Sequence, residues 1–178
     1  MTRQNNAFFI PVLVVVGPGL IGGSVAAALK QAGCVGKVIG VSRQPSTTAQ
    51  ALHLGLIDEI ADLVTATQQA DVILLATPVR ATRTLLEEIQ PHLQPHTVIT
   101  DAGSTKADVL ADALQVLGDQ AAQFVPGHPI AGAEKAGPDA AFAELYRNRI
   151  VILTRHKNNT MSVRQQMTQL WEACGARV

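Results

Sequence analysis

A glycine-rich stretch near the amino end of the chain, VLVVVGPGLIGGS over residues 12–24, constrains the fold more than any other feature. Its first five residues are apolar and mostly β-branched, as in a strand that is buried on both faces of a parallel sheet. The run stops at a G-x-G-x-x-G match, and the periodic residues from Leu20 to Ala32 predict a helix that is closed by Gly33. In this order, strand, glycine turn and helix indicate a dinucleotide-binding site rather than a plain βα turn.

The residues of the glycine turn each have a physical role in that interpretation. Gly17 permits the tight turn, Gly19 lets the backbone approach a pyrophosphate, and Gly22 lets the helix pack closely on the strand. The first helical turn, which includes Leu20 and Ile21, presents free backbone N–H groups at the positive end of the helix dipole. We therefore predict that this turn binds the phosphates of a dinucleotide.

Length, composition and charge exclude several other classes of protein. The 178 residues suffice for one domain with a hydrophobic core, and an apolar content of 47% argues against disorder. Fourteen basic and fourteen acidic residues give no net charge, which argues against a nucleic-acid partner. The two cysteines, Cys34 and Cys174, are far apart and indicate a reducing compartment, with neither a disulfide framework nor a metal motif.

An uncharged run from Gln4 to Leu29 imitates a signal peptide or a membrane span. Pro11 and the glycines of the turn break any single helix there, and the strand–turn–helix interpretation accounts for those glycines. We therefore expect a soluble, cytoplasmic protein without a membrane partner. Residues 1–10 are expected to form a flexible tail, and residues 11–178 a dinucleotide-binding domain.

The rest of the chain alternates strand-like and helix-like segments. Strands are predicted at 37–42, 71–77, 97–101, 123–125 and 149–154, with a further short strand within 57–63. Helices are predicted at 46–54, 79–93, 105–117 and 161–174. Ser46 or Thr47 would cap the first of these helices, and Ser104 or Thr105 would cap the third. The alternation predicts an α/β fold with a doubly wound, mostly parallel, Rossmann-like sheet.

The end of the second strand distinguishes between the two nicotinamide dinucleotides. A carboxylate there accepts a hydrogen bond from the ribose 2′-hydroxyl of NAD, whereas a basic residue pairs with the 2′-phosphate of NADP. No aspartate or glutamate precedes Asp58, and Ser42 and Arg43 occupy the expected place. A guanidinium binds phosphate through two parallel hydrogen bonds, and a serine hydroxyl adds another. We predict NADP as the preferred cofactor and NAD as the alternative; otherwise Arg43 is a solvated loop charge.

Open α/β sheets bind ligands beyond the carboxyl ends of their strands, where three segments of this chain are predicted to lie. Thr77 and Pro78 could line the ribose and pyrophosphate, or form an ordinary strand-to-helix turn. Ser104 could reach the nicotinamide or a substrate oxygen, or only cap a helix. His128, between a glycine and a proline, is placed for acid–base catalysis because histidine exchanges protons near neutral pH.

Some charged residues near these segments have two interpretations. Lys106 is either a surface helix residue or a group that steers anions, and the Glu134–Lys135 pair is either a solvated turn or a support for the His128 loop. The other four histidines fall on predicted surfaces or in polar turns. The sequence has no G-x-S-x-G, no P-loop and no metal-spaced histidine–cysteine set, which argues against hydrolase and NTPase classes.

Four motifs together resemble one family. GPGLIGGS, the strand end ATPV, the turn DAGSTK and above all GHPIAGAEKAG at 127–137 are similar to prephenate and arogenate dehydrogenases of tyrosine biosynthesis. The resemblance runs from about Val12 to the end of the chain. It implies oxidation of the ring hydroxyl carbon of prephenate or arogenate, with hydride transfer to NAD(P)⁺ and loss of carbon dioxide. It also implies that His128 deprotonates the ring hydroxyl, and that Ser104 orients that hydroxyl and the nicotinamide.

The same resemblance implies a following helical domain that dimerises and supplies further substrate contacts, including an arginine for a carboxylate. Since the chain stops at Val178, we expect that domain to be absent, turnover by this part alone to be low, and the full-length protein to be a homodimer. Two alternatives remain open. One is an NADP-dependent reductase of the β-hydroxyacid or pyrroline-carboxylate type, which would not be expected to carry GHPIAGAEKAG; the other is a non-enzymatic NADP-binding regulatory module.

Overall fold

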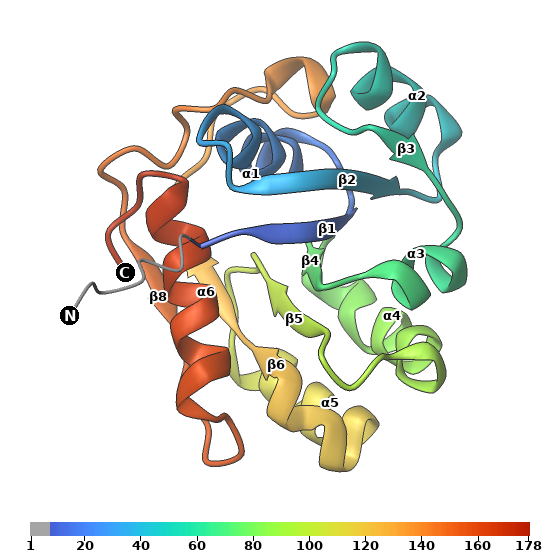
Figure 1. Ribbon diagram of the computed structural model, residues 1–178, viewed down its shortest axis with the longest axis vertical. Coiled ribbons are helices and arrows are strands. Elements are labelled where there is room, and N and C mark those ends of the chain that lie inside the picture. Colours follow the sequence, from blue (N-terminus) through green and yellow to red (C-terminus); the bar gives the residue numbers. More distant parts are fainter. Residues whose placement is uncertain (1–7) are drawn as a thin grey trace, which may run out of the picture.

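The computed structural model describes residues 8–178, and its centre is a six-stranded parallel sheet (Figure 1). The strands are β1 (Ile10–Val16), β2 (Val35–Val41), β3 (Glu59–Ile60), β4 (Val72–Leu75), β5 (Val98–Asp101) and β6 (Phe124–Val125). They pair in the order β3-β2-β1-β4-β5-β6, all parallel. The winding reverses between β1 and β4, and open α/β sheets bind ligands at such a switch point. The predicted doubly wound, mostly parallel, Rossmann-like fold is confirmed.

Helices cover both faces of the sheet. On one face lie α1 (Leu20–Gln31), α2 (Pro45–His53) and α6 (Met161–Ala173); on the other lie α3 (Leu63–Gln69), α4 (Thr82–Ile89) and α5 (Ala107–Leu117). Leu13 and Val15 of β1 belong to the first core, and Val14 and Val16 to the second. Because successive side chains of a strand point to opposite faces, a strand covered on both sides is apolar throughout. None of the helices within residues 8–178 has the length and apolar character that crossing a membrane requires.

Two predicted helices have different boundaries in the structure. α2 begins at Pro45 with Gln44 as its N-cap residue, so the predicted caps, Ser46 and Thr47, are wrong. Proline suits the first helical position because its fixed φ is helical and its missing N–H needs no partner there. The predicted helix 79–93 is α4 flanked by two 3₁₀ turns, and Pro91 lies in the second of these. Proline cannot donate the backbone hydrogen bond that a longer α-helix requires.

The start of β1 and the helix α3 also differ from the predictions. Ile10, predicted as the last residue of the flexible tail, instead begins β1 and is fully buried. Residues 1–7 of that predicted tail lie outside the described residues. The helix α3 was not predicted because its sequence, LVTATQQ, is mostly polar. Asp62 caps it by accepting a hydrogen bond from the Thr65 N–H at 2.9 Å, which is a recognisable helix start.

A second, two-stranded sheet carries His128. β7 (Gly127–Pro129) follows β6 after one residue and pairs antiparallel with β8 (Val151–Leu153). The predicted strand 149–154 therefore exists, but it does not join the parallel sheet. Pro126, between β6 and β7, has no N–H to donate, and the strand leaves the parallel ladder at that residue.

Candidate functional site

The glycine turn between β1 and α1 has the geometry of a phosphate cradle. Gly17 has a φ of +88°, a conformation that residues with a side chain rarely adopt. A Cβ at Gly22 would stand 2.6 Å from the Gly17 carbonyl oxygen and 2.6 Å from Cγ1 of Val15, so the close packing of α1 on β1 requires glycine. No side chain caps α1, and its first turn has no acidic residue. The N–H groups at the start of α1 are therefore left for an anion.

Gly19 lies against a segment from much later in the chain. A Cβ at Gly19 would stand 3.8 Å from Cα of Gly137, the last residue of the GHPIAGAEKAG motif. This motif therefore runs from β7 to the glycine turn, and the space in front of Gly19 is shared with Gly137. Glu134 and Lys135 within the motif are exposed, as in a solvated turn.

Thr77 follows β4 and faces the glycine turn across the switch point. A Cβ at Gly17 would stand 3.1 Å from Cγ2 of Thr77. The Oγ1 atom of Thr77 is buried and has no hydrogen-bond partner within residues 8–178. An unpaired buried hydroxyl is costly, so this atom is one that a bound dinucleotide would satisfy. Together with the uncapped start of α1, it shows that the residues present fit a dinucleotide; Pro78, the next residue, is exposed.

Ser42 and Arg43 follow β2 at the same edge of the sheet. Oγ of Ser42 accepts a hydrogen bond from the Gln44 N–H at 3.1 Å, which leaves its own O–H able to donate. Arg43 is exposed and has no ion-pair partner in the described part of the chain. Both side chains are therefore available to a ligand at the end of β2.

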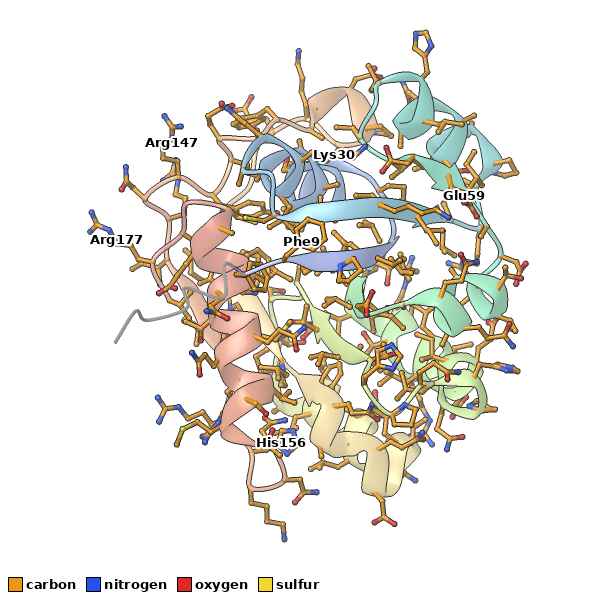
Figure 2. All side chains as sticks on the ribbon, in the orientation of Figure 1. Phe9, Lys30, Glu59, Arg147, His156 and Arg177 are labelled. Atoms are coloured by element: carbon orange, nitrogen blue, oxygen red, sulfur yellow. The ribbon has the colours of Figure 1, made fainter. Side chains whose placement is uncertain are left out.

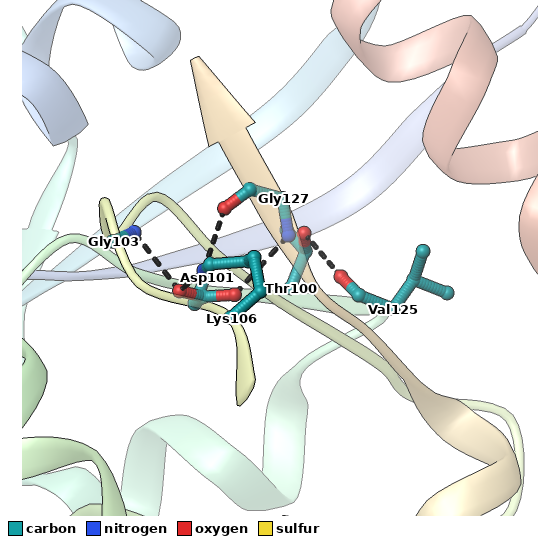
Figure 3. A network of polar contacts seen from close by, with 6 residues as sticks. All are labelled: Thr100, Asp101, Gly103, Lys106, Val125 and Gly127. Atoms are coloured by element: carbon teal, nitrogen blue, oxygen red, sulfur yellow. Dashed lines mark hydrogen bonds and ion pairs between the residues drawn. The ribbon is translucent and has the colours of Figure 1, made fainter. Parts of the chain in front are cut away.

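A buried carboxylate at the end of β5 organises the other half of the site (Figure 3). The Asp101 side chain is 3% exposed and accepts hydrogen bonds from the Gly103 N–H at 2.9 Å and the Gly127 N–H at 3.1 Å. It also pairs with Nζ of Lys106, which donates to the Gly127 carbonyl oxygen at 2.8 Å. Burial raises the pKa of Asp101 and lowers the pKa of Lys106, while the hydrogen bond and attraction between the two oppose both shifts.

The Asp101 carboxylate places the backbone next to both predicted catalytic residues. Gly103 immediately precedes Ser104, and Gly127 immediately precedes His128. Ser104 is exposed, and His128 is half-buried in β7. Both residues therefore follow the carboxyl ends of the neighbouring strands β5 and β6, at the edge that also carries the glycine turn.

The turn after β5 corrects two predictions. α5 begins at Ala107 and no side chain caps it, so the predicted caps, Ser104 and Thr105, are wrong. Lys106 is neither a surface residue nor a free steering charge, because its ammonium group is held by Asp101 and Gly127. The sequence carries only a weak signal for this pair: a carboxylate ends an apolar strand, and a lysine follows five residues later.

An open groove lies elsewhere, between β8 and α6, and none of the predicted site residues line it. Its lining is largely apolar and includes Ile150, Ile152, Met161 and Val178. Its charged groups are Arg155 and Arg164, and it contains neither the glycine turn nor His128. Within residues 8–178, no group of histidine, cysteine, aspartate or glutamate side chains is arranged to hold a metal ion. The polar groups suited to chemistry therefore gather at the sheet edge and not in this groove.

Several known proteins are similar to this chain over most of its length. A family model described as "Prephenate dehydrogenase, nucleotide-binding domain" matches residues 25–178. The prephenate dehydrogenase of Bacillus subtilis is 37% identical over 166 residues, which are 92% of this chain and 44% of that protein. The chain spans about half the length of the curated relatives it matches.

Two solved structures are similar in both sequence and fold. Prephenate dehydrogenase from Aquifex aeolicus, in complex with hydroxyphenyl propionate and NAD⁺, is 32% identical with a TM-score of 0.90. That match covers 97% of this chain and 60% of the Aquifex chain. Synechocystis arogenate dehydrogenase is 35% identical with a TM-score of 0.84, over 93% of this chain and 58% of that one.

Proposed function

Because the chain belongs to the prephenate dehydrogenase family, we propose that it is the dinucleotide-binding part of an enzyme that oxidises and decarboxylates prephenate or arogenate. The observation that carries this proposal is the Asp101 carboxylate, which holds the backbone immediately before Ser104 and His128. Family membership disfavours a reductase of the β-hydroxyacid or pyrroline-carboxylate type. The other alternative is a regulatory module that binds NADP and catalyses no reaction. Measurable turnover in an activity assay would exclude it.

The residues of the chain have separate roles in the proposed reaction. A ring nitrogen of His128 accepts the proton of the substrate's ring hydroxyl, while Ser104 holds that oxygen by a hydrogen bond. Removing this proton lowers the barrier, because positive charge develops on the ring carbon as a hydride leaves it. A nicotinamide bound in the site supplies the hydride acceptor. The electron pair of the breaking C–CO₂ bond then enters the ring, which becomes aromatic as carbon dioxide departs.

The glycine turn and its neighbours would hold the dinucleotide for this chemistry. The first-turn N–H groups of Leu20 and Ile21 lie where a pyrophosphate binds in folds of this class. The unpaired hydroxyl of Thr77 belongs to a side chain whose methyl carbon lies next to Gly17 of the same turn. Fixing the cofactor and the substrate in one geometry is worth several orders of magnitude in rate, so these residues contribute by orientation.

We propose that NADP⁺ binds more tightly than NAD⁺. The Aquifex relative is described with NAD⁺, so this preference rests on the chain's own Ser42 and Arg43. Arg43→Ala should weaken NADP⁺ binding by about 1.5–3 kcal/mol, the range for a hydrogen bond to a charged group, and leave NAD⁺ binding nearly unchanged. Arg177→Ala is the control, because Arg177 is exposed near the chain terminus beside α6 (Figure 2). Equal affinities of the parent chain for the two cofactors, measured by calorimetry, would contradict the preference.

The catalytic roles are tested by turnover of prephenate and of arogenate. The assay uses this chain and a fusion that adds the carboxyl-terminal part of the Bacillus subtilis relative, since the chain covers 44% of that protein. His128→Asn keeps a hydrogen-bond donor but cannot take the proton, so kcat should fall by about 10²–10⁴-fold with little change in cofactor affinity. The rise of the rate with pH on the acid side should also disappear.

Two further variants sharpen this assay. Ser104→Ala should raise the activation barrier by only about 0.5–1.5 kcal/mol, since it removes one hydrogen bond. Its effect should not add to that of His128→Asn if both groups hold the same hydroxyl. His53→Asn is the control because His53 is exposed on α2. A His128→Asn enzyme with near-parent kcat and an unchanged pH profile would show that His128 is only a structural residue of β7.

We also propose that a longer form of the protein is a cytoplasmic homodimer and that this part alone turns over slowly. The support is the resemblance of its motifs to the family. Light scattering of the fusion and of the chain alone measures the first point, and a monomeric fusion would contradict it. Turnover by the chain alone at the rate of the fusion would contradict the second.

A further inference from the structure

We propose that the Asp101–Lys106 ion pair positions His128, and that both residues act on the reaction through the Gly127 backbone without touching the substrate. In this assignment Asp101 and Lys106 are positioning residues. The catalytic part of this role rests on the proposed function, whereas the positioning itself can be measured on the chain alone.

The ion pair forms hydrogen bonds with both polar groups of the Gly127 backbone. Asp101 accepts from the Gly127 N–H at 3.1 Å, and Nζ of Lys106 donates to the Gly127 carbonyl oxygen at 2.8 Å (Figure 3). These two groups lie on either side of one Cα atom, so holding both fixes φ and ψ of Gly127. Glycine has the greatest backbone freedom of any residue, and those two angles set the direction in which the chain enters His128. The ion pair therefore supplies a constraint that Gly127 lacks by itself.

Gly127 is required at this position by close packing. A Cβ at Gly127 would stand 2.7 Å from the Asp101 carbonyl oxygen, so any side chain there would push β7 away from the end of β5. The close approach places the Asp101 carboxylate next to the Gly127 N–H. The same close packing therefore requires a flexible glycine at position 127 and brings the Asp101 carboxylate within reach of its N–H.

The opposite side of β7 is held by β8. The Ile130 N–H donates to the Ile150 carbonyl oxygen at 2.8 Å, and the Thr154 N–H donates to the Pro126 carbonyl oxygen at 2.9 Å. These bonds use residues on either side of Gly127, as expected where alternate residues of an antiparallel strand face the partner. The strand that carries His128 is therefore hydrogen-bonded on one side to the ion pair and on the other side to β8.

Lys106 is poorly placed to bind a substrate anion. Its side chain is 14% exposed, and its ammonium group already contacts the Asp101 carboxylate and the Gly127 carbonyl oxygen. A substrate carboxylate would have to displace Asp101, and breaking a buried ion pair leaves a charge uncompensated. This geometry favours a positioning role over direct substrate binding.

The positioning is tested by amide hydrogen exchange and by NMR of the His128 ring in the chain itself. Lys106→Met keeps the aliphatic stem and removes the ammonium group. The Gly127 amide should then exchange about 10- to 100-fold faster, the range expected when a hydrogen bond to a charged group is weakened. The ring signals of His128 should broaden or divide. Lys106→Arg restores the charge and should recover most of the protection.

A matched control and a second variant keep the test decisive. Lys30 on α1 (Figure 2) pairs with Asp58 at 2.6 Å and donates to the Gly55 carbonyl oxygen at 2.9 Å, so it has the same kinds of partner in a more exposed pair. Lys30→Met should leave the Gly127 exchange unchanged. If Lys106→Met does not fold, Asp101→Asn serves in its place, because it keeps a side-chain oxygen but cannot form the ion pair. Unchanged Gly127 exchange in the folded variant would overturn the assignment.

Kinetics of the fusion separate positioning from substrate binding. A positioning role predicts that Lys106→Met lowers kcat by about tenfold or more, changes KM for the substrate by less than about twofold, and is rescued by Lys106→Arg. A large rise in KM with kcat retained would instead show that Lys106 binds the substrate. If the parent fusion has no turnover, the proposed function fails, and the exchange experiment still decides whether the ion pair holds Gly127.

Discussion

Substituting the glycines of the turn one at a time separates folding from cofactor binding. A Cβ at Gly22 would stand 2.6 Å from the Gly17 carbonyl oxygen, 2.6 Å from Cγ1 of Val15 and 3.0 Å from Cβ of Ala76. An extra methyl in a packed site costs about 1–3 kcal/mol, and alanine recovers about 1 kcal/mol in helix propensity. Because one of these contacts is with a backbone oxygen, which cannot move aside as a flexible side chain can, we use the upper end of this destabilisation range. We expect Gly22→Ala to lower the free energy of unfolding by about 2 kcal/mol.

Thermal unfolding followed by circular dichroism measures this loss. For a domain of this size, about 2 kcal/mol corresponds to a fall in Tm of roughly 4–8 °C. Gly19→Ala is the control within the same turn, because its φ is −88° and the nearest atom would be 3.8 Å from the added Cβ. It should leave Tm nearly unchanged while it weakens cofactor binding, since its methyl enters the space in front of the turn. Equal Tm values for Gly22→Ala and the parent, or equal losses in both variants, would refute this reasoning.

Three further perturbations test individual groups. Burial raises the pKa of Cys174, so its thiol stays protonated near neutral pH and should react with a thiol reagent only after unfolding. The half-buried Cys34 should react in the native chain. Fast reaction of both thiols in the native chain would contradict this. Thr77→Val removes the unpaired hydroxyl and should weaken cofactor binding without lowering Tm; unchanged affinity would show that the hydroxyl does not bind the dinucleotide. Hydrogen bonds from Thr65 hold the pKa of Asp62 below its ordinary value, so the stability that Asp62 contributes is present at neutral pH and is lost as the pH falls through that lowered pKa. Asp62→Ala should therefore lower Tm at pH 7 and have little effect in strong acid, and a difference that persists in strong acid would count against this.

The sheet could be predicted from sequence because its signals are local. Apolar, β-branched runs such as Val12–Val16 mark buried strands, and Gly17 and Gly33 mark turns at positions where the structure has positive φ. α3 has few apolar residues, and its N-cap at Asp62 is its main signal. The antiparallel pairing of β7 with β8 was not predicted, because alternation of strands and helices describes connections and not pairings.

The supports of the site could not be predicted, because they join residues that are far apart in sequence. The Asp101–Gly127 hydrogen bond spans 26 residues, and the Tyr146 hydroxyl donates to the Ile21 carbonyl oxygen at 2.7 Å across 125 residues. The Phe142 N–H donates to Oγ of Ser24 at 3.1 Å in the same region. Such contacts depend on tertiary packing, which periodicity and motif spacing do not reveal. Ser104 and His128 were predicted from motifs and remain predictions, whereas the groups that hold the backbone before them became visible only in the structure.

Binding of a nicotinamide dinucleotide across the switch point of the sheet is the claim on which the others depend. Titration of NADP⁺ into the ¹⁵N-labelled chain, followed by amide chemical shifts, measures where that ligand binds. We predict that the largest shifts fall on the glycine turn and the first turn of α1, on Ser42 and Arg43, on Thr77 and on Gly137. Saturable shifts confined to the groove between β8 and α6, or no shifts at millimolar NADP⁺ and NAD⁺, would contradict the claim.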